Sequence, residues 1–161
     1  MKTIGDLLSR PLSRKIEEII QVDQRDEQSV FDDITEYVAT DKIREQYHQL
    51  FKAIAEAPSD PHEGIGVWVS GFFGSGKSSY AKYHGYALQN RPLKESSFAE
   101  LFKKQLDEQP NGDSVHRISY LLDSINARIP TDVILFEVAK ERDTRKVTER
   151  IAELMYTVLL R

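Results

Sequence analysis

The chain has 161 residues, of which 40% are hydrophobic and 30% are charged. This composition is typical of a globular protein, and no apolar run is long enough to cross a bilayer, so neither a membrane protein nor a disordered chain is expected. The formal charge of −4 argues against a basic module that coats nucleic acid. The chain has no cysteine, which excludes disulfides and thiolate sites, and no secretory signal is recognised, so we predict a cytoplasmic protein.

Residues 1–57 form a lead region that is predicted to be mostly helical. Leu12 and Ile16 fall on one face of an amphipathic stretch, which favours a short helix near the N-terminus. Residues 28–40 are compatible with a helix followed by an extended Glu-Tyr-Val-Ala-Thr piece, and the pattern alone leaves this open. After this piece, apolar side chains recur at helical spacing until Pro58, so a further helix is predicted there.

A linker at residues 58–64 separates the lead region from a denser α/β region at residues 65–161. Residues 65–69, Ile-Gly-Val-Trp-Val, form a short apolar run that predicts a buried strand with Trp68 in the core. Residues 76–90 are predicted to form a helix, because an Arg-Pro pair ends the pattern.

Two more helices, a second strand and a last helix are predicted beyond this point. Ser97 and Glu100 have the spacing of a capping box, and Asp113 or Ser114 can cap the next helix. Residues 133–136, Val-Ile-Leu-Phe, have the pattern of a buried strand, and the last helix is predicted after them. Two parallel strands are too few to bury these helices, so we expect the complete domain to contain a larger parallel sheet. The chain is therefore predicted to be an incomplete N-terminal fragment of that domain.

The strongest motif joins the first predicted strand to the following helix. Residues 71–78, Gly-Phe-Phe-Gly-Ser-Gly-Lys-Ser, match G-x-x-x-x-G-K-[ST] at every fixed position. Between a strand and a helix this pattern is typical of the phosphate-binding loop called Walker A. Its glycines permit backbone angles that other residues avoid, and the positive end of the following helix favours a bound polyphosphate.

Each position of the loop has a predicted role. Lys77 is expected to contact the β- and γ-phosphates of ATP, Ser78 to bind Mg²⁺, and Ser79 to donate to the α-phosphate. Phe72 and Phe73 have two interpretations, contact with a base or a partner subunit, or packing over their own helix. The predicted nucleotide-binding residues are Gly71, Phe72, Phe73, Gly74, Ser75, Gly76, Lys77, Ser78 and Ser79.

ATP hydrolysis needs an acidic residue besides the loop, usually at the end of a hydrophobic strand. Glu137 directly follows the second predicted strand and is a candidate for this Walker B role, although a solvated carboxylate at a strand end is the commoner explanation. No other catalytic residue is assigned. The four histidines lack the spacing of metal ligands. Tyr80, Tyr83 and Tyr86 recur at helical spacing and are expected to pack against the sheet.

The sequence around the loop resembles a known family. The segments that carry the resemblance are MKTIGDLLSRPLSRKIEEIIQVDQ, EYVAT-D-x-I and GIGVWVSGFFGSGKSSYAKYHGYAL. Together they are similar to the N-terminal portion of the BrxC/PglY family, the large P-loop proteins of bacteriophage exclusion (BREX) systems, from residue 1 to about residue 140. The resemblance implies an ATPase component of a bacterial antiphage complex that works with a DNA methyltransferase and other subunits. It carries phosphate binding over to Gly71, Gly74, Gly76, Lys77 and Ser78.

The sequence therefore predicts an α/β P-loop NTPase fold of the AAA+-like kind, with residues 65–161 as the first part of the nucleotide-binding domain. The predicted function is binding of ATP and Mg²⁺, with hydrolysis in the intact protein. The alternatives are a nucleotide-gated scaffold without turnover and a small P-loop kinase. The expected partners are ATP, other BREX subunits and further copies of the chain, with DNA reached only through the complex or the rest of the protein.

Overall fold

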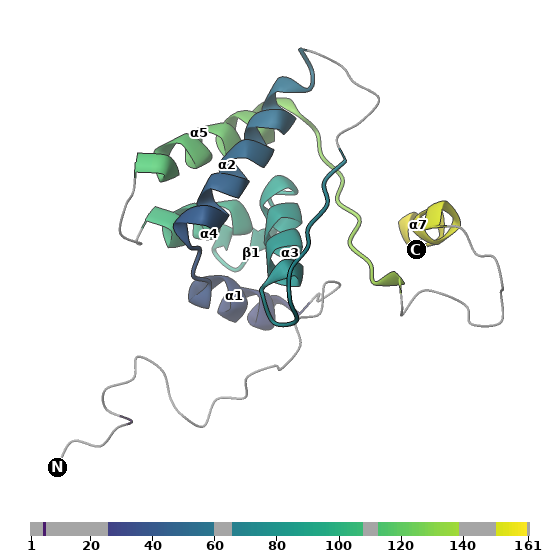
Figure 1. The fold of residues 1–161 in the computed structure, drawn as a ribbon, viewed down its shortest axis with the longest axis horizontal. Helices are drawn as coiled ribbons and strands as arrows, with labels where there is room; N and C mark the ends of the chain where they lie inside the picture. The colour runs from purple at the N-terminus through teal and green to yellow at the C-terminus, as the bar shows by residue number, and fades with distance from the viewer. Residues whose placement is uncertain (1–4, 6–25, 60–65, 108–112, 139–150, 161) are drawn as a thin grey trace.

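The computed structural model describes residues 5, 26–59, 66–107, 113–138 and 151–160, and most of them lie in helices (Figure 1). The helices are α1 (Glu27–Glu36), α2 (Asp41–Glu56), α3 (Lys77–Leu88), α4 (Phe98–Asp107), α5 (Asp113–Arg128) and α7 (Ile151–Leu159). Between α3 and α4, the strands β1 (Pro92–Leu93) and β2 (Ser96–Ser97) pair as an antiparallel hairpin. The helices in these ranges are too short or too polar to span a bilayer.

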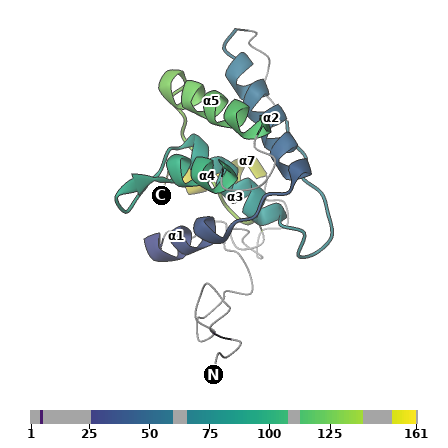
Figure 2. The same cartoon turned by 90° about the vertical axis from the view of Figure 1, so that its left-hand side faces the viewer.

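Helices α1 to α5 pack into one bundle (Figures 1 and 2). Helix α2 lies along α5, and α4 contacts α1, α3 and α5. Their apolar stripes share one core, so residues from both sides of segment 58–64 are buried together. Its fully buried apolar side chains include Val30 and Ile34 from α1, Tyr47 and Phe51 from α2, Phe98, Phe102 and Leu106 from α4, and Ile118, Leu122 and Ile125 from α5.

An aromatic cluster fixes α3 against α2 and α4. Tyr47 of α2 stacks on Tyr80 of α3 with 4.5 Å between ring centroids, and meets Phe102 of α4 edge to face at 5.1 Å. Phe98 of α4 meets Tyr86 of α3 edge to face at 5.4 Å. Such pairs bury large apolar area and add a favourable ring geometry. The helix that follows the predicted phosphate loop is therefore held on two sides.

The helices predicted from the sequence are confirmed where the structure describes them. Helix α1 ends at Glu36 and residues 37–40 are extended, which resolves the alternatives left open for this segment. Helix α4 begins directly after Ser97, whose Oγ accepts from the backbone N–H of Glu100 at 3.3 Å. These helix starts follow from local capping chemistry, which a sequence displays directly.

The predicted α/β P-loop NTPase fold with a parallel sheet is wrong. In the described ranges the paired strands are β1 and β2, and they are antiparallel. Residues 66–70 and 131–137 cover the two segments predicted to be buried strands, but neither is a strand or has a strand partner among the described residues, and residues 66–70 are exposed. Trp68, predicted to lie in the core, is 90% exposed. The architecture is a helical bundle with a small hairpin.

The two extended segments lie against α3 instead of in a sheet. Residues 67–70 line a cavity together with Tyr80 of α3. Val133 packs against Gly85, where a Cβ would lie 2.8 Å from the Val133 Cγ1. β-branched residues favour extended backbone, but a sheet forms only where a neighbouring strand satisfies the ladder hydrogen bonds. The helices bury their apolar stripes against one another, which explains how a core forms without that sheet.

Other features predicted from the sequence differ or lie outside the described residues. The short N-terminal helix and the first turns of the last predicted helix are outside them, while α7 covers the rest of that last helix. Tyr83 and Tyr86 are buried as expected, but they pack against Phe98 of α4 rather than a sheet. The hairpin was not predicted. Its turn contains Lys94 at a φ of 54°. Hairpin turns with positive φ usually contain Asn or Gly, so a lysine at this position gave no signal of a turn in the sequence.

Replacing Thr40 with alanine is expected to destabilise the protein by about 1 kcal/mol. Its Oγ1 accepts from the backbone N–H of Ile43 at 3.3 Å and so caps α2. Thr40→Ser keeps a hydroxyl cap and is expected to stay close to the wild type. Urea denaturation of the two variants measures the difference, and equal destabilisation by both would show that the hydroxyl does not act as a cap.

Candidate functional site

Residues 71–76 join the extended segment to α3 as an exposed loop. Gly74 and Gly76 have φ angles of +76° and +83°. Residues with a Cβ adopt such angles only with strain, so the backbone itself requires glycine at both positions. The backbone N–H of Ser75 donates to the carbonyl of Phe72 at 3.2 Å and closes the turn.

The Lys77 side chain folds back over this loop. Its Nζ donates to the carbonyl oxygens of Gly71 at 2.9 Å and Phe72 at 2.7 Å. The partners of the ammonium are thus neutral carbonyl groups. Lys77 stands at the positive end of the α3 dipole, where a bound anion would be electrostatically favourable. The structure therefore places the Lys77 ammonium over the loop backbone, and its contact with phosphates stays a prediction.

Helix α3 starts at Lys77 without a side-chain cap, because its N-cap residue is Gly76. Its first turn contains no acidic residue. The N–H groups of such a turn need an external acceptor, and a phosphate oxygen is a suitable one. Ser78 is exposed beside Lys77, so its hydroxyl is accessible for the predicted Mg²⁺ contact, whereas Ser79 is buried on the covered side of the same turn.

The two aromatic residues of the loop, Phe72 and Phe73, are almost fully exposed. Their exposed fractions are 91% and 98%. Packing over their own helix, one of the two interpretations from the sequence, is therefore wrong. Contact with a base or a partner subunit is the interpretation that is left for these side chains.

Glu137, the Walker B candidate, is exposed at the end of segment 131–137. That segment is not part of a sheet in the described residues, so the strand that would aim this carboxylate at the loop is not formed. Its catalytic role stays a prediction.

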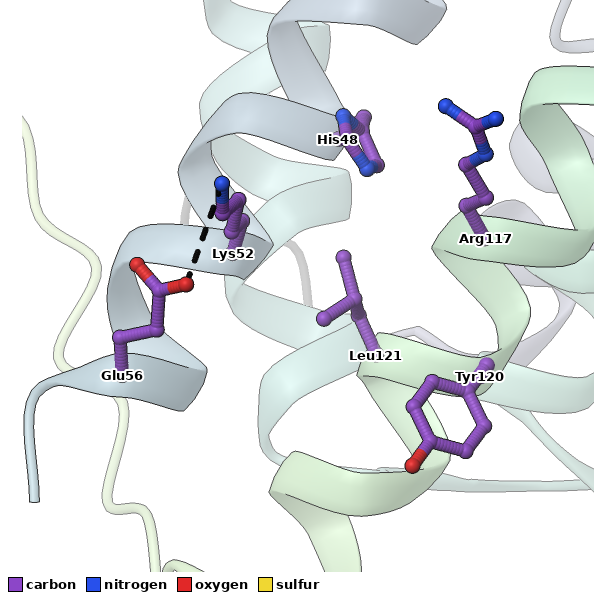
Figure 3. A pocket seen from close by; sticks show the side chains of 6 residues that line it. All are labelled: His48, Lys52, Glu56, Arg117, Tyr120 and Leu121. Carbon is purple, nitrogen blue, oxygen red and sulfur yellow. Dashed lines mark ion pairs between the residues drawn. The ribbon is translucent and has the colours of Figure 1, made fainter. Parts of the chain in front are cut away.

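A cationic cavity of about 470 Å³ lies between α2 and α5 (Figure 3). It is lined by His48, Lys52 and Glu56 of α2 and by Arg117, Tyr120 and Leu121 of α5. Figure 3 shows His48 on α2 and Arg117 on α5 side by side in the upper part of the view, with Leu121 below and between them. The Lys52 Nζ lies 3.9 Å from a carboxylate oxygen of Glu56, a solvent-exposed pair that contributes little stability. Because basic side chains of two helices meet here, this cavity is a competing place for an anion.

A hollow of different character lies between α2 and residues 66–70. We call it the α2 groove and define it by a cavity of about 420 Å³ lined by Gln46, Gln49, Leu50, Ala53, Val67, Trp68, Val69, Ser70 and Tyr80. A smaller cavity of about 320 Å³ shares Leu50 and Tyr80 and continues to His84. The residues that line the α2 groove and those that line the cationic cavity have no member in common. The α2 groove and the cationic cavity are therefore separate.

Neither hollow has the donor set of a metal site. Within the described residues, no group of three His, Asp or Glu side chains is placed to hold a metal ion. No protein-family model matches the chain, and no solved structure matches it. The similarity to the BrxC/PglY family therefore stays a prediction from the sequence, and the site is judged by its own chemistry.

Proposed function

We propose that residues 71–78 bind the phosphates of ATP together with Mg²⁺. The observation that supports this most is the complete motif at the uncapped start of α3, with the Lys77 ammonium folded over the loop. N–H donors, a positive helix end and a mobile cation each favour a polyphosphate, and all three belong to the loop and to α3. The proposal therefore does not depend on a parallel sheet.

Each side chain has a defined part in this proposal. Lys77 exchanges its two carbonyl partners for β- and γ-phosphate oxygens, which are stronger acceptors because they are charged. Ser78, exposed beside it, supplies a hydroxyl oxygen to Mg²⁺. When bound, Mg²⁺ neutralises part of the phosphate charge.

We propose nucleotide binding for this chain, and hydrolysis is proposed from the resemblance alone. Glu137, the candidate for orienting water, stands at the end of a segment that pairs with no strand among the described residues. A nucleotide-gated scaffold, in which binding alone regulates contacts, is therefore a second candidate function.

The cellular context is proposed from the resemblance alone. We propose a cytoplasmic component of an antiphage defence complex, in which nucleotide binding regulates contacts with other BREX subunits or with further copies of the chain. The exposed Phe72 and Phe73 beside the phosphate loop support such a contact. Light scattering over a range of concentrations, with and without MgATP, tests self-association, and a monomer under all conditions would contradict that part.

Titration calorimetry with MgATP tests the binding function directly. Lys77→Ala is expected to weaken binding by about 10- to 100-fold, the usual effect of losing a hydrogen-bonding charge on a phosphate. The matched control is Arg117→Ala, which removes the same charge from the cationic cavity and should leave binding unchanged. Melting curves of both variants establish that they are folded.

The opposite pattern would contradict the proposal. If MgATP bound equally to Lys77→Ala but not to Arg117→Ala, the anion site would be the cavity between α2 and α5. If the folded wild-type chain bound no MgATP at all, residues 71–78 would not form a nucleotide site in this chain.

A further inference from the structure

The α2 groove begins where the phosphate loop begins. Ser70, which lines it, is the residue before Gly71, and Tyr80, which also lines it, is in the first turn of α3 after Lys77. Residues on both sides of the phosphate loop in the sequence therefore line the groove. A ligand that placed its phosphates at Lys77 would have the rest of its structure close to this hollow.

The chemistry of the groove suits a neutral, flat group. Its walls combine apolar and aromatic side chains, among them Val67, Trp68 and Tyr80, with polar ones, and none of the lining residues that the structure describes is charged. Its volume of about 420 Å³ is in the range of small-molecule sites. A phosphate would find no cation among these described lining residues, whereas a heterocyclic base would find aromatic surface on which to stack.

Two amides on α2 add donors and acceptors to this surface. The Gln49 Nε2 donates to Glu45 at 3.0 Å, an arrangement that orients the amide and leaves its Oε1 as an acceptor. Gln46 lies one helical turn before Leu50 in the same lining. Glutamine amides can pair with the amino group and a ring nitrogen of adenine at once.

Trp68 is a stacking surface that the fold leaves uncovered. It is the one tryptophan of the chain and is 90% exposed although it lies in an apolar segment. An indole contributes little to folding at this exposure, but a stacked base would cover it. Its position at the groove is thus better explained by a ligand than by the core.

From these observations we infer that the α2 groove binds the adenine base of the nucleotide, with Trp68 as the stacking residue and the amides of Gln46 and Gln49 at the base edge. The inference rests on the proposed function, since the phosphates of the same molecule occupy residues 71–78. It gives the site a preference for a purine nucleotide over a bare polyphosphate.

The fluorescence of Trp68 reports on this directly, because no other tryptophan contributes. MgATP is expected to quench the emission, whereas inorganic tripolyphosphate with Mg²⁺ should bind at Lys77 without quenching. By calorimetry, Trp68→Ala should weaken MgATP binding by about 10-fold and leave tripolyphosphate binding unchanged. Trp68→Phe should restore much of the affinity. Tyr120→Ala, which removes another exposed aromatic residue away from the groove, should have no effect.

The outcomes separate this inference from the proposed function. If ATP and tripolyphosphate bind equally and the Trp68 emission does not change, the base site is wrong and phosphate binding stands. If neither ligand binds, both proposals fail. If the emission changes with protein concentration instead of with ATP, a second copy of the chain covers Trp68 and the base site is likewise overturned.

Discussion

Replacing Asp33 with alanine is expected to destabilise the protein by about 3 kcal/mol, because it leaves a buried ammonium without its partner. Lys82 of α3 is only 1% exposed, and its Nζ lies 3.0 Å from the Oδ2 of Asp33 on α1. The Lys82 cation also lies 6.0 Å from the centre of the Tyr86 ring. Neither the ring nor solvent can replace the carboxylate at this burial. Urea denaturation of Asp33→Ala measures the effect.

A double variant tests whether the destabilisation comes from the unpaired Lys82 ammonium or from the loss of other contacts of the Asp33 side chain. Lys82→Met keeps the length of the side chain and removes its charge, so Asp33→Ala combined with Lys82→Met should recover most of the lost stability. If the double variant were as unstable as Asp33→Ala alone, the buried ammonium would not be the cause. Because the pair joins α1 to α3, it also links the lead region to the helix that carries Lys77 and Ser78.

The parts of the fold that the sequence predicted are those encoded by neighbouring residues. The start of α2 is set by Thr40 and the residues just after it, and the start of α4 by Ser97 and Glu100. Both signals act over three residues, so they can be recognised without knowing what packs nearby. The strand prediction failed for the opposite reason. Residues 66–70 have the composition of a strand, but pairing depends on a distant segment that no local pattern specifies.

The candidate site divides in the same way. The phosphate loop could be predicted because its donors, its glycines and Lys77 are contiguous. The α2 groove could not, because it brings Gln46 and Gln49 together with Trp68, about twenty residues further along the chain. Two glutamines on the exposed face of a helix carry no signal of their own. A tryptophan three residues before the loop was the available sign, and it was assigned to the core because aromatic residues in apolar segments are usually buried.

His84 is expected to make the protein sensitive to acid. Its ring stacks on Phe51 with 4.9 Å between centroids, and its buried Nδ1 has no hydrogen-bond partner among the described residues. Burial lowers the pKa of His84 from its usual 6.5 to about 4. Between these two values the unfolded chain binds the proton and the folded chain does not, so stability falls as the pH falls. The loss begins near the unfolded pKa, reaches about 3 kcal/mol near the folded pKa, and then levels off.

The variant His84→Phe tests this, because phenylalanine fits an aromatic environment and does not titrate. Urea denaturation at about pH 7 and about pH 4.5 should give a wild-type protein that loses about 2 to 3 kcal/mol more than the variant, since all other titrating groups are common to both. Two parallel pH profiles would show that His84 is protonated as easily in the folded chain as in the unfolded one. His84 also lines the cavity that extends the α2 groove, beside Tyr80. A bound base that covers this cavity would further oppose protonation of the folded chain, so adenine nucleotides should extend the acid-induced loss of stability of the wild type to lower pH and have no such effect on His84→Phe.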